Sequence, residues 1–155
     1  MIKIKYLCEY PNYLPQITQL WHDCIGKKWR PDVPLSEIES RFRQHLNKDA
    51  LPLTYIALDG EKIVGMCSLR SDDGLQSKYV PWLGSLCVEE AYRKRGIGKL
   101  LVQMTKEKAH KMGFHKLYLF TFEQEIADWY TRDGWKEEGK CIYKDHPAII
   151  MEIAV

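Results

Sequence analysis

The segment YRKRGIGKLL, residues 92–101, decides the fold, and it begins with an electrostatic conflict. Three cationic side chains and two glycines stand at the start of residues 97–113, with Gly96 directly before them and Gly98 within them, and the apolar spacing of these residues predicts a long helix. A helix start is already positive, because its first N–H groups are unpaired and the backbone dipole points that way, so each cation there costs about 0.3–1 kcal/mol. The segment contains no Ser, Thr, Asp or Asn that would cap the helix. An anion bound at the helix start would resolve the conflict.

The residues on both sides of this helix indicate which strands it connects. WLGSLCV, residues 82–88, and HKLYLFTF, residues 115–122, are largely apolar and predict strands buried on both faces. A strand, a helix and a second strand joined by a crossover of this length form a parallel pair. The glycines would let a phosphate approach the backbone N–H groups, and Arg93 and Arg95 would add bidentate hydrogen bonds.

The rest of the chain predicts further strands and helices around this pair. Residues 53–70 read as two antiparallel strands around the turn dipeptide Asp59-Gly60. Ser36, three residues before Glu39, forms the pattern of a capping box that opens a helix. The remaining predicted elements are a strand at 2–10, helices at 15–25, 36–47 and 124–134, and strands at 135–144 and 148–155. This order predicts an α/β protein with a mixed sheet and helices on its faces.

Composition predicts one cytoplasmic domain, residues 1–155. With 45% hydrophobic residues the chain is able to bury a core, and no apolar run is long enough for a membrane span or a signal peptide. The five cysteines are an odd number without C-x-x-C pairing, which indicates reduced thiols and neither a disulfide framework nor a zinc site. The histidines show no metal-ligand spacing, so no metal is expected.

Charge is distributed unevenly along the chain. Residues 93–116 contain eight Lys or Arg and one acid, a charge of +7, so the remainder of this +2 chain carries −5. Two common phosphate-binding motifs fail: a Walker A loop needs Gly where Arg93 stands and Ser or Thr where Leu100 stands, and a dinucleotide fingerprint needs Gly where Leu101 stands. A nucleic-acid-binding stripe of Lys99, Lys106 and Lys111 gives the glycine spacing no role, so we expect no nucleic-acid partner.

The pattern that does match is R-x-x-G-x-G, formed by Arg93, Gly96 and Gly98 and followed by an amphipathic helix and LYLFT. LGSLCVEEAYRKRGIGKLL, residues 83–101, resembles the cofactor segment of the GNAT superfamily of N-acetyltransferases. IADWYTRDGW, residues 126–135, is similar to its second signature, and the order of elements agrees over nearly the whole chain. The chain is most similar in these motifs to a bacterial small-molecule-type subgroup.

The resemblance implies a mixed, mostly antiparallel sheet of about six to seven strands, with a splayed central parallel pair and about four helices. It also implies that acetyl-CoA is the cosubstrate, with its diphosphate at the loop and its pantetheine arm along the unpaired strand edge. The implied cofactor-binding residues are Leu86, Cys87, Val88, Arg93, Lys94, Arg95, Gly96, Ile97, Gly98, Lys99 and Tyr130.

Acetyl transfer to an amine needs a base and an acid. An alkyl ammonium has a pKa near 10 and must lose a proton before it attacks, and the departing thiolate must gain one. Tyr130 matches the family's general acid. Some relatives carry a Glu on the strand that here reads WLGSL, so Asp72, Asp73 and Glu123 are the nearest candidates for the base, with Asp73 and Glu123 as our assignments.

The acceptor is expected to be a small-molecule or peptide amine, bound by Trp29, Arg30, Trp82 and Phe122. Polyamines, aminoglycosides, amino acids and peptide N-termini all remain open. The closing strands present a face that would allow a homodimer.

Other interpretations of these residues stay open at this stage. Tyr130 is also consistent with a core aromatic, and the cations are also consistent with a solvated surface paired with Glu89 and Glu90. Cys87 as an acetyl-carrying nucleophile is disfavoured, because no His follows closely to activate it and it lies in a core strand. A catalytically silent acyl-CoA sensor is the alternative function from a different class.

Overall fold

A seven-stranded sheet organises the computed structural model, which describes residues 1–75 and 77–155. The strand order is β1-β2-β3-β4-β5-β7-β6, and every neighbouring pair is antiparallel except β4 with β5. The strands are β1 (Ile2–Tyr6), β2 (Leu53–Asp59), β3 (Lys62–Arg70), β4 (Trp82–Val88), β5 (Lys116–Thr121), β6 (Lys136–Tyr143) and β7 (His146–Ala154). The helices are α1 (Leu14–Trp21), α2 (Lys27–Trp29), α3 (Leu35–Arg43), α4 (Ile97–Lys111) and α5 (Gln124–Thr131).

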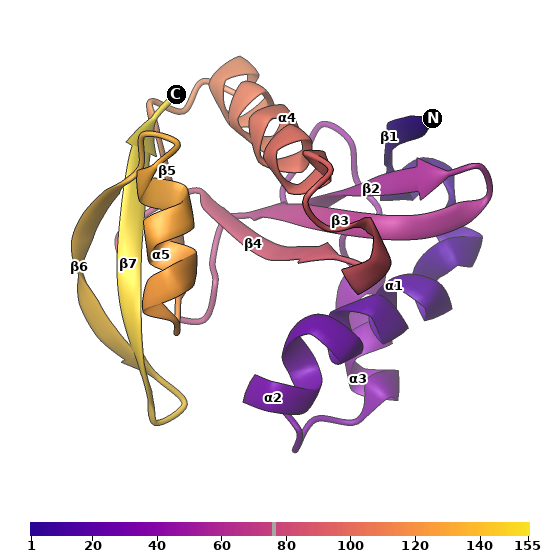
Figure 1. The fold of residues 1–155 in the computed structure, drawn as a ribbon, viewed down its shortest axis with the longest axis horizontal. Helices are drawn as coiled ribbons and strands as arrows, with labels where there is room; N and C mark the ends of the chain where they lie inside the picture. The colour runs from indigo at the N-terminus through magenta and orange to yellow at the C-terminus, as the bar shows by residue number, and fades with distance from the viewer. Residues whose placement is uncertain (76) are drawn as a thin grey trace.

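Helices cover the two faces of the sheet (Figure 1). Helix α4 lies on one side of strands β2 to β4, and α1, α2 and α3 lie on the other. On the α4 side, buried residues of α4, α5 and β5 such as Leu101, Tyr130 and Leu117 form one core cluster. On the α1 side, Ile17 and Cys87 belong to a second cluster. None of the described helices has the length and apolar character needed to cross a membrane.

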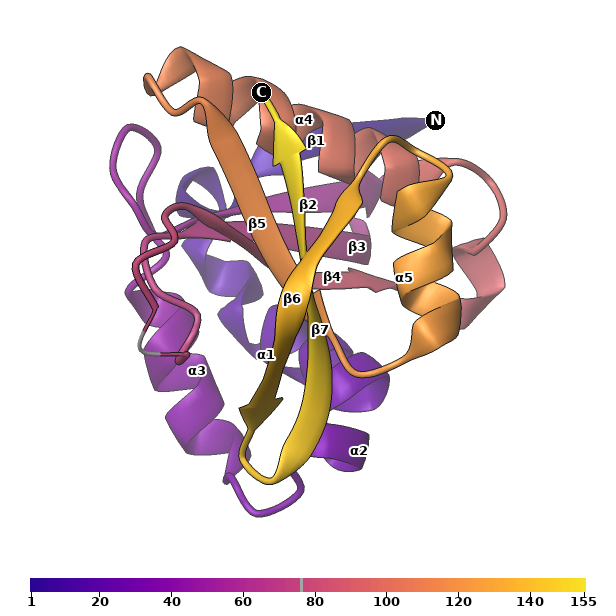
Figure 2. The same ribbon diagram turned by 90° about the vertical axis from the view of Figure 1, so that its left-hand side faces the viewer.

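The sheet opens along the seam between β4 and β5. In the described part of the chain, Trp82 and Tyr118 are the one residue pair that joins these parallel strands. The register of β4 on β3 also shifts between Met66 and Ser68, opposite Ser85, whose φ of +51° lies in the left-handed region that non-glycine residues rarely adopt. Figure 2 shows the consequence, because β5, β7 and β6 run across the direction of β2, β3 and β4. The predicted splayed parallel pair is therefore confirmed.

Three local predictions were wrong at the N-terminal side. The first strand ends at Tyr6 and continues into a short 3-10 turn. The predicted loop after residue 25 is helical as far as Trp29, through the π-helical turn η3 (His22–Gly26) and α2. The capping box is not formed. Helix α3 begins at Leu35, because the Pro34 carbonyl already accepts from the N–H groups of Glu37 and Ile38, and no side chain caps the helix.

The α1-side core contains a buried histidine whose titration predicts acid sensitivity. The side chain of His45 is 6% exposed, and its Nδ1 lies 2.8 Å from Thr54 Oγ1. Burial, together with the nearby Arg70 charge, lowers the pKa of His45 to about 3. In the unfolded chain its pKa returns to about 6.5, so only the unfolded state gains a proton as the pH falls from 6.5 towards 3.

His45 should therefore lower the free energy of unfolding by about 2 kcal/mol as the pH falls from 7 to 5. Urea unfolding at both pH values, in wild type and in His45→Gln, measures this, and the variant should lose about 2 kcal/mol less stability over that interval. His110→Gln, at an exposed position on α4, serves as the control and should follow wild type. Equal pH dependence in wild type and His45→Gln would contradict the prediction.

Candidate active site

The loop before α4 presents backbone N–H groups without a side-chain cap. Gly96 is the N-cap residue of α4 at φ +82°, and no described side chain accepts a hydrogen bond from the first turn. Lys94 is also left-handed, at φ +63°, and alternation of this kind turns successive N–H groups towards one point. A side-chain carbon built on Gly96 would meet nothing within 4 Å, so the space over the loop is open. The donor set and the open approach fit a diphosphate.

The three cations of the loop have different surroundings. Arg93 Nε donates to the Val88 carbonyl at 2.9 Å, and Arg93 Nη2 lies 3.9 Å from Cys24 Sγ. The Arg95 guanidinium carbon lies 4.9 Å from the centre of the Tyr92 ring. Across the described residues, none of the three cations forms an ion pair with the acids at 89 and 90, and Glu89 instead pairs with Lys62 at 3.1 Å. The alternative in which the loop cations pair with Glu89 and Glu90 is therefore not supported by this structure.

The end of β4 that leads into the loop borders the open seam, because within the described chain β4 pairs with β5 only at Trp82. Leu86 and Val88 pack with the α4-side core, and Cys87 packs with the α1-side core. The expected row of free backbone groups needs one refinement, because the Val88 carbonyl accepts from Arg93 and lies 3.9 Å from Cys24 Sγ. This contact holds residues 89–96, the predicted cofactor loop, against the end of β4.

Tyr130 lies on the α4 side of the seam. Its side chain is 4% exposed and stands edge-to-face against Trp129 and Trp135, with ring centres 4.9 and 5.4 Å away. Burial raises the pKa of Tyr130 well above its usual value, with smaller contributions from Cys67 and Cys87. The phenol is therefore protonated at neutral pH, as a proton donor must be.

Asp73 lies on the α1 side of β4, directly over Gly84. A side-chain carbon on Gly84 would lie 3.1 Å from Asp73 Oδ1 and 3.2 Å from Arg70 Nη1, so the carboxylate and its partner occupy the space that a side chain at 84 would take. Arg70 Nη1 donates to Asp73 Oδ1 at 2.7 Å, and Arg70 Nη2 donates to Ser85 Oγ at the bulge. Burial raises the pKa of Asp73 and outweighs the opposing effect of Arg70.

The other two candidate bases are more exposed. Glu123 precedes α5, is paired with Lys28, and keeps 39% of its side chain exposed. Asp72 accepts from the Gly74 N–H at 2.8 Å within its own loop. Asp73 is therefore the carboxylate that the structure brings against β4.

The four residues expected to bind the acceptor all lie against residues of β6 or β7. The Trp29 ring lies 4.4 Å from Phe122 and 5.1 Å from His146, measured between ring centres. Arg30 Nη1 donates to Tyr143 Oη at 3.0 Å. Trp82 is 1% exposed and donates through Nε1 to the Tyr79 carbonyl, so it supports this region from within the core.

A cavity of about 400 Å³ connects Arg30 and Tyr143 to Asp73. It lies between α3 and the segment that follows β3, and Arg70 and His45 also line it. Sequence reasoning missed Arg70, Ser85 and Tyr143, which are far apart in the chain. Gly84 was the available signal, since a glycine within an otherwise bulky strand indicates close approach by another group.

A match to a family model identifies the family of this chain. The model of the acetyltransferase (GNAT) family matches residues 14–134, which include the loop, both seam strands and Tyr130. The chain belongs to this family of acetyltransferases. No curated protein matches the chain.

Solved structures show that the fold is shared over the full length. An aminoglycoside 6'-N-acetyltransferase in complex with coenzyme A aligns with a TM-score of 0.75 at 18% identity, covering 99% of this chain and 96% of that one. An acetyltransferase from Streptococcus agalactiae aligns with a TM-score of 0.75 at 23% identity, covering 99% and 98%. A GNAT acetyltransferase from Streptococcus pneumoniae gives 0.74 at 20% identity, covering 100% and 99%.

Proposed function

We propose that residues 1–155 form one acetyltransferase domain that moves the acetyl group of acetyl-CoA to a primary amine by direct attack in a ternary complex. One observation supports the proposal: a buried phenol and a carboxylate, our candidates for the acid and the base, flank β4 from opposite faces. Tyr130 belongs to the core on the α4 side, and Asp73 shares its cavity with Ile38 and Phe42 on the α3 side. This arrangement places the acid and the base on opposite faces of the sheet.

Acetyl-CoA supplies the electrophilic thioester carbonyl and the diphosphate. Backbone N–H groups of residues 96–99 bind the diphosphate, with Lys94 and Arg95 adding positive charge. The edge formed by residues 86–88 orients the pantetheine arm, and a backbone N–H of β4 stabilises the oxyanion that develops during attack.

The proton steps follow from the two environments. The acceptor ammonium reaches β4 from the α1 side, and Asp73 takes its proton directly or through water. The raised pKa of Asp73 makes it a better base near neutral pH than an ordinary carboxylate. Tyr130 donates its proton to the departing thiolate from the α4 side, and burial keeps that proton in place until the thiolate forms.

We propose that the acceptor is a small-molecule or peptide amine that enters through the cavity of about 400 Å³ beside Asp73. Trp29 and Phe122 close one side of the approach, and Arg30 is held across it by Tyr143. A cytoplasmic location and pairing with a second copy remain predictions, as does the absence of a nucleic-acid partner.

Release of CoA thiol from acetyl-CoA tests the function directly. A panel of polyamines, aminoglycosides, amino acids and short peptides should contain acceptors that raise thiol release well above the rate without amine. Mass spectrometry should find the acetylated amine in equal amount. Binding of acetyl-CoA without amine-dependent release for any acceptor would instead support the sensor alternative.

Gly84→Ala should displace the base without removing it. The new methyl group would stand 3.1 Å from Asp73 Oδ1, so the carboxylate must shift. Misplacement of a catalytic group by about 1 Å costs on the order of 100-fold, so a shift of a few tenths of an ångström should lower kcat about 3- to 10-fold while the Kd for acetyl-CoA stays unchanged. Gly139→Ala on β6, where an added carbon meets nothing within 4 Å, is the matched control. Wild-type kcat in Gly84→Ala would count against Asp73.

A further inference from the structure

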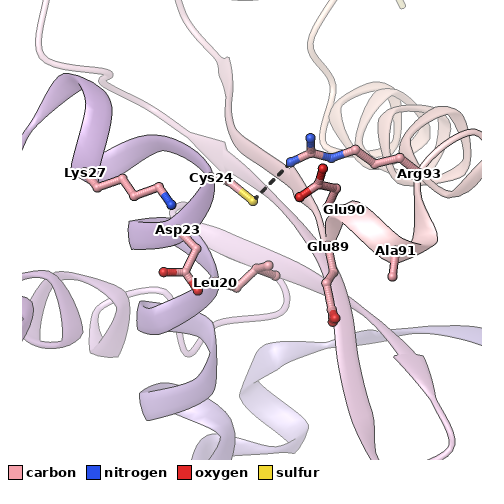
Figure 3. Close-up of a pocket in the computed structure, with 8 residues that line it drawn as sticks. All are labelled: Leu20, Asp23, Cys24, Lys27, Glu89, Glu90, Ala91 and Arg93. Atoms are coloured by element: carbon pink, nitrogen blue, oxygen red, sulfur yellow. Dashed lines mark hydrogen bonds between the residues drawn. The ribbon is translucent and has the colours of Figure 1, made fainter.

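A pair of cysteines that the proposed reaction does not use as nucleophiles lies at the end of β4. The π-helical turn η3 carries Cys24 towards this strand, with Cys24 Sγ 3.9 Å from the Val88 carbonyl oxygen and 3.9 Å from Arg93 Nη2 (Figure 3). A π-turn adds one residue to a helical turn and is frequent at functional positions. Here the π-turn places the Cys24 thiol next to the guanidinium of Arg93, which lies 69 residues later in the chain.

Cys24 opens onto a cavity of about 610 Å³ between η3 and the start of the cofactor loop. Its lining is charged, and Figure 3 shows Asp23 and Lys27 on the helix side facing Glu89, Glu90 and Arg93 on the loop side. Small polar reagents therefore have a route to the sulfur. The side chain is only partly buried, in contrast to Cys67 and Cys87.

The surroundings of Cys24 favour its thiolate. Hydrogen bonds from Cys87 and, to a smaller extent, Arg93 lower the pKa of Cys24 to about 7, against the effect of burial. An ordinary thiol with a pKa of about 8.5 is about 3% ionised at pH 7, whereas Cys24 would be about half ionised. Thiolates are the nucleophilic form of cysteine, so this sulfur is the reactive one.

Cys87 has the opposite character. It is 2% exposed, and burial followed by the hydrogen bond to Cys24 raises the pKa of Cys87 well above its usual value. The pair therefore combines one partly exposed thiol that ionises readily with one buried, protonated thiol, and both side chains pack in the same α1-side core cluster. An attacking thiolate and a neighbouring resolving thiol are the two parts of a redox-sensitive cysteine site.

We propose that Cys24 and Cys87 form a disulfide in response to hydroperoxides. The Cys24 thiolate attacks the O–O bond, an S–O bond forms, and the released oxygen leaves as water or alcohol after taking a proton from solvent. The Cys87 sulfur then attacks the Cys24 sulfenic acid. The S–O bond breaks, and the hydroxyl leaves as water with the Cys87 proton. The two thiols lose two electrons, and the hydroperoxide gains them.

This bond would join η3 to β4 beside Val88, and it would remove the thiolate that Arg93 contacts. The oxidised state thus differs from the reduced state at the first residue of the R-x-x-G-x-G loop. A thiol reductant would restore both free cysteines. The proposal does not depend on which amine is acetylated, or on whether acetyl transfer occurs.

Peptide mapping of the full-length protein tests the bond. Reduced protein is treated at pH 7 with a few equivalents of hydrogen peroxide, alkylated and digested. We expect a peptide pair linked through Cys24 and Cys87 that dithiothreitol separates. Cys87→Ser should leave Cys24 as a sulfenic acid that dimedone labels, and Cys141→Ser should link as wild type does. Cys24 left reduced, or oxidised to sulfinic acid beside a free Cys87, would overturn the proposal.

A pH profile provides a second test that needs no oxidation. The rate of Cys24 alkylation by iodoacetamide should reach half its maximum near pH 7, whereas burial raises the pKa of Cys141 and places its profile higher. Arg93→Gln removes the charge next to the sulfur and should move the Cys24 profile to higher pH. Coincident profiles for Cys24 and Cys141 would contradict the assignment.

Discussion

Replacing Tyr130 by Phe is expected to lower kcat about 100- to 1000-fold without weakening acetyl-CoA binding. The substitution removes only the hydroxyl and keeps the ring between Trp129 and Trp135, so the core on the α4 side stays packed. Without the phenol, the thiolate must leave unprotonated or wait for water. Steady-state thiol release and acetyl-CoA titration calorimetry on the same preparation measure the two quantities.

Tyr55→Phe is the matched control for this prediction. Tyr55 is 3% exposed in the same core cluster, and its hydroxyl lies 3.3 Å from the Tyr6 hydroxyl, away from the catalytic proposal. We expect a small change in thermal stability and wild-type kcat. If Tyr130→Phe also retains kcat within about twofold, Tyr130 is a core aromatic and the acid assignment fails.

Asp73→Asn should produce a loss of similar size, about 100- to 1000-fold in kcat. Asn keeps the shape of the side chain and still accepts a hydrogen bond from Arg70, but it does not take a proton at neutral pH. In wild type, kcat should fall on the acidic side through an apparent pKa above the usual carboxyl range, because burial raises the pKa of Asp73. That acidic limb should disappear in Asp73→Asn.

Glu123→Gln distinguishes between the two proposed bases. Glu123 keeps 39% of its side chain exposed and is paired with Lys28, so we expect its loss to change kcat less than threefold and to leave the acidic limb in place. The reverse result, with Glu123→Gln inactive and Asp73→Asn active, would transfer the role to the residue before α5.

The cofactor loop was predictable because its information is local. The glycine spacing, the missing cap and the long amphipathic helix all fall within about twenty residues, and the structure places Gly96 as the left-handed N-cap of α4. The splayed pair of parallel strands was predicted from the family resemblance. The direction of the Arg93 side chain could not be predicted, because its partners are Val88 in the preceding strand and Cys24 in a distant helix.

The base and the thiol pair show where sequence reasoning stopped. Asp73 was one of several nearby acids, and its selection depends on the segment after β3 folding back so that the carboxylate lies over Gly84. The contact between Cys24 and Cys87 depends on a π-turn that no residue pattern indicated. Both features arise from tertiary contacts, which local propensity and periodicity do not encode.

Thermal unfolding with acetyl-CoA and with S-acetyl-pantetheine, at equal concentration, tests the central claim most directly. The two ligands share the thioester and the pantetheine arm, and only acetyl-CoA carries the diphosphate. At 100 times its Kd, acetyl-CoA should add about 2.7 kcal/mol of stability, roughly 5–10 °C in Tm for a chain of this size. S-acetyl-pantetheine and duplex DNA should shift Tm by less than about 1 °C under these conditions. Equal shifts for acetyl-CoA and S-acetyl-pantetheine, or no shift with acetyl-CoA, would contradict a diphosphate site at the start of α4.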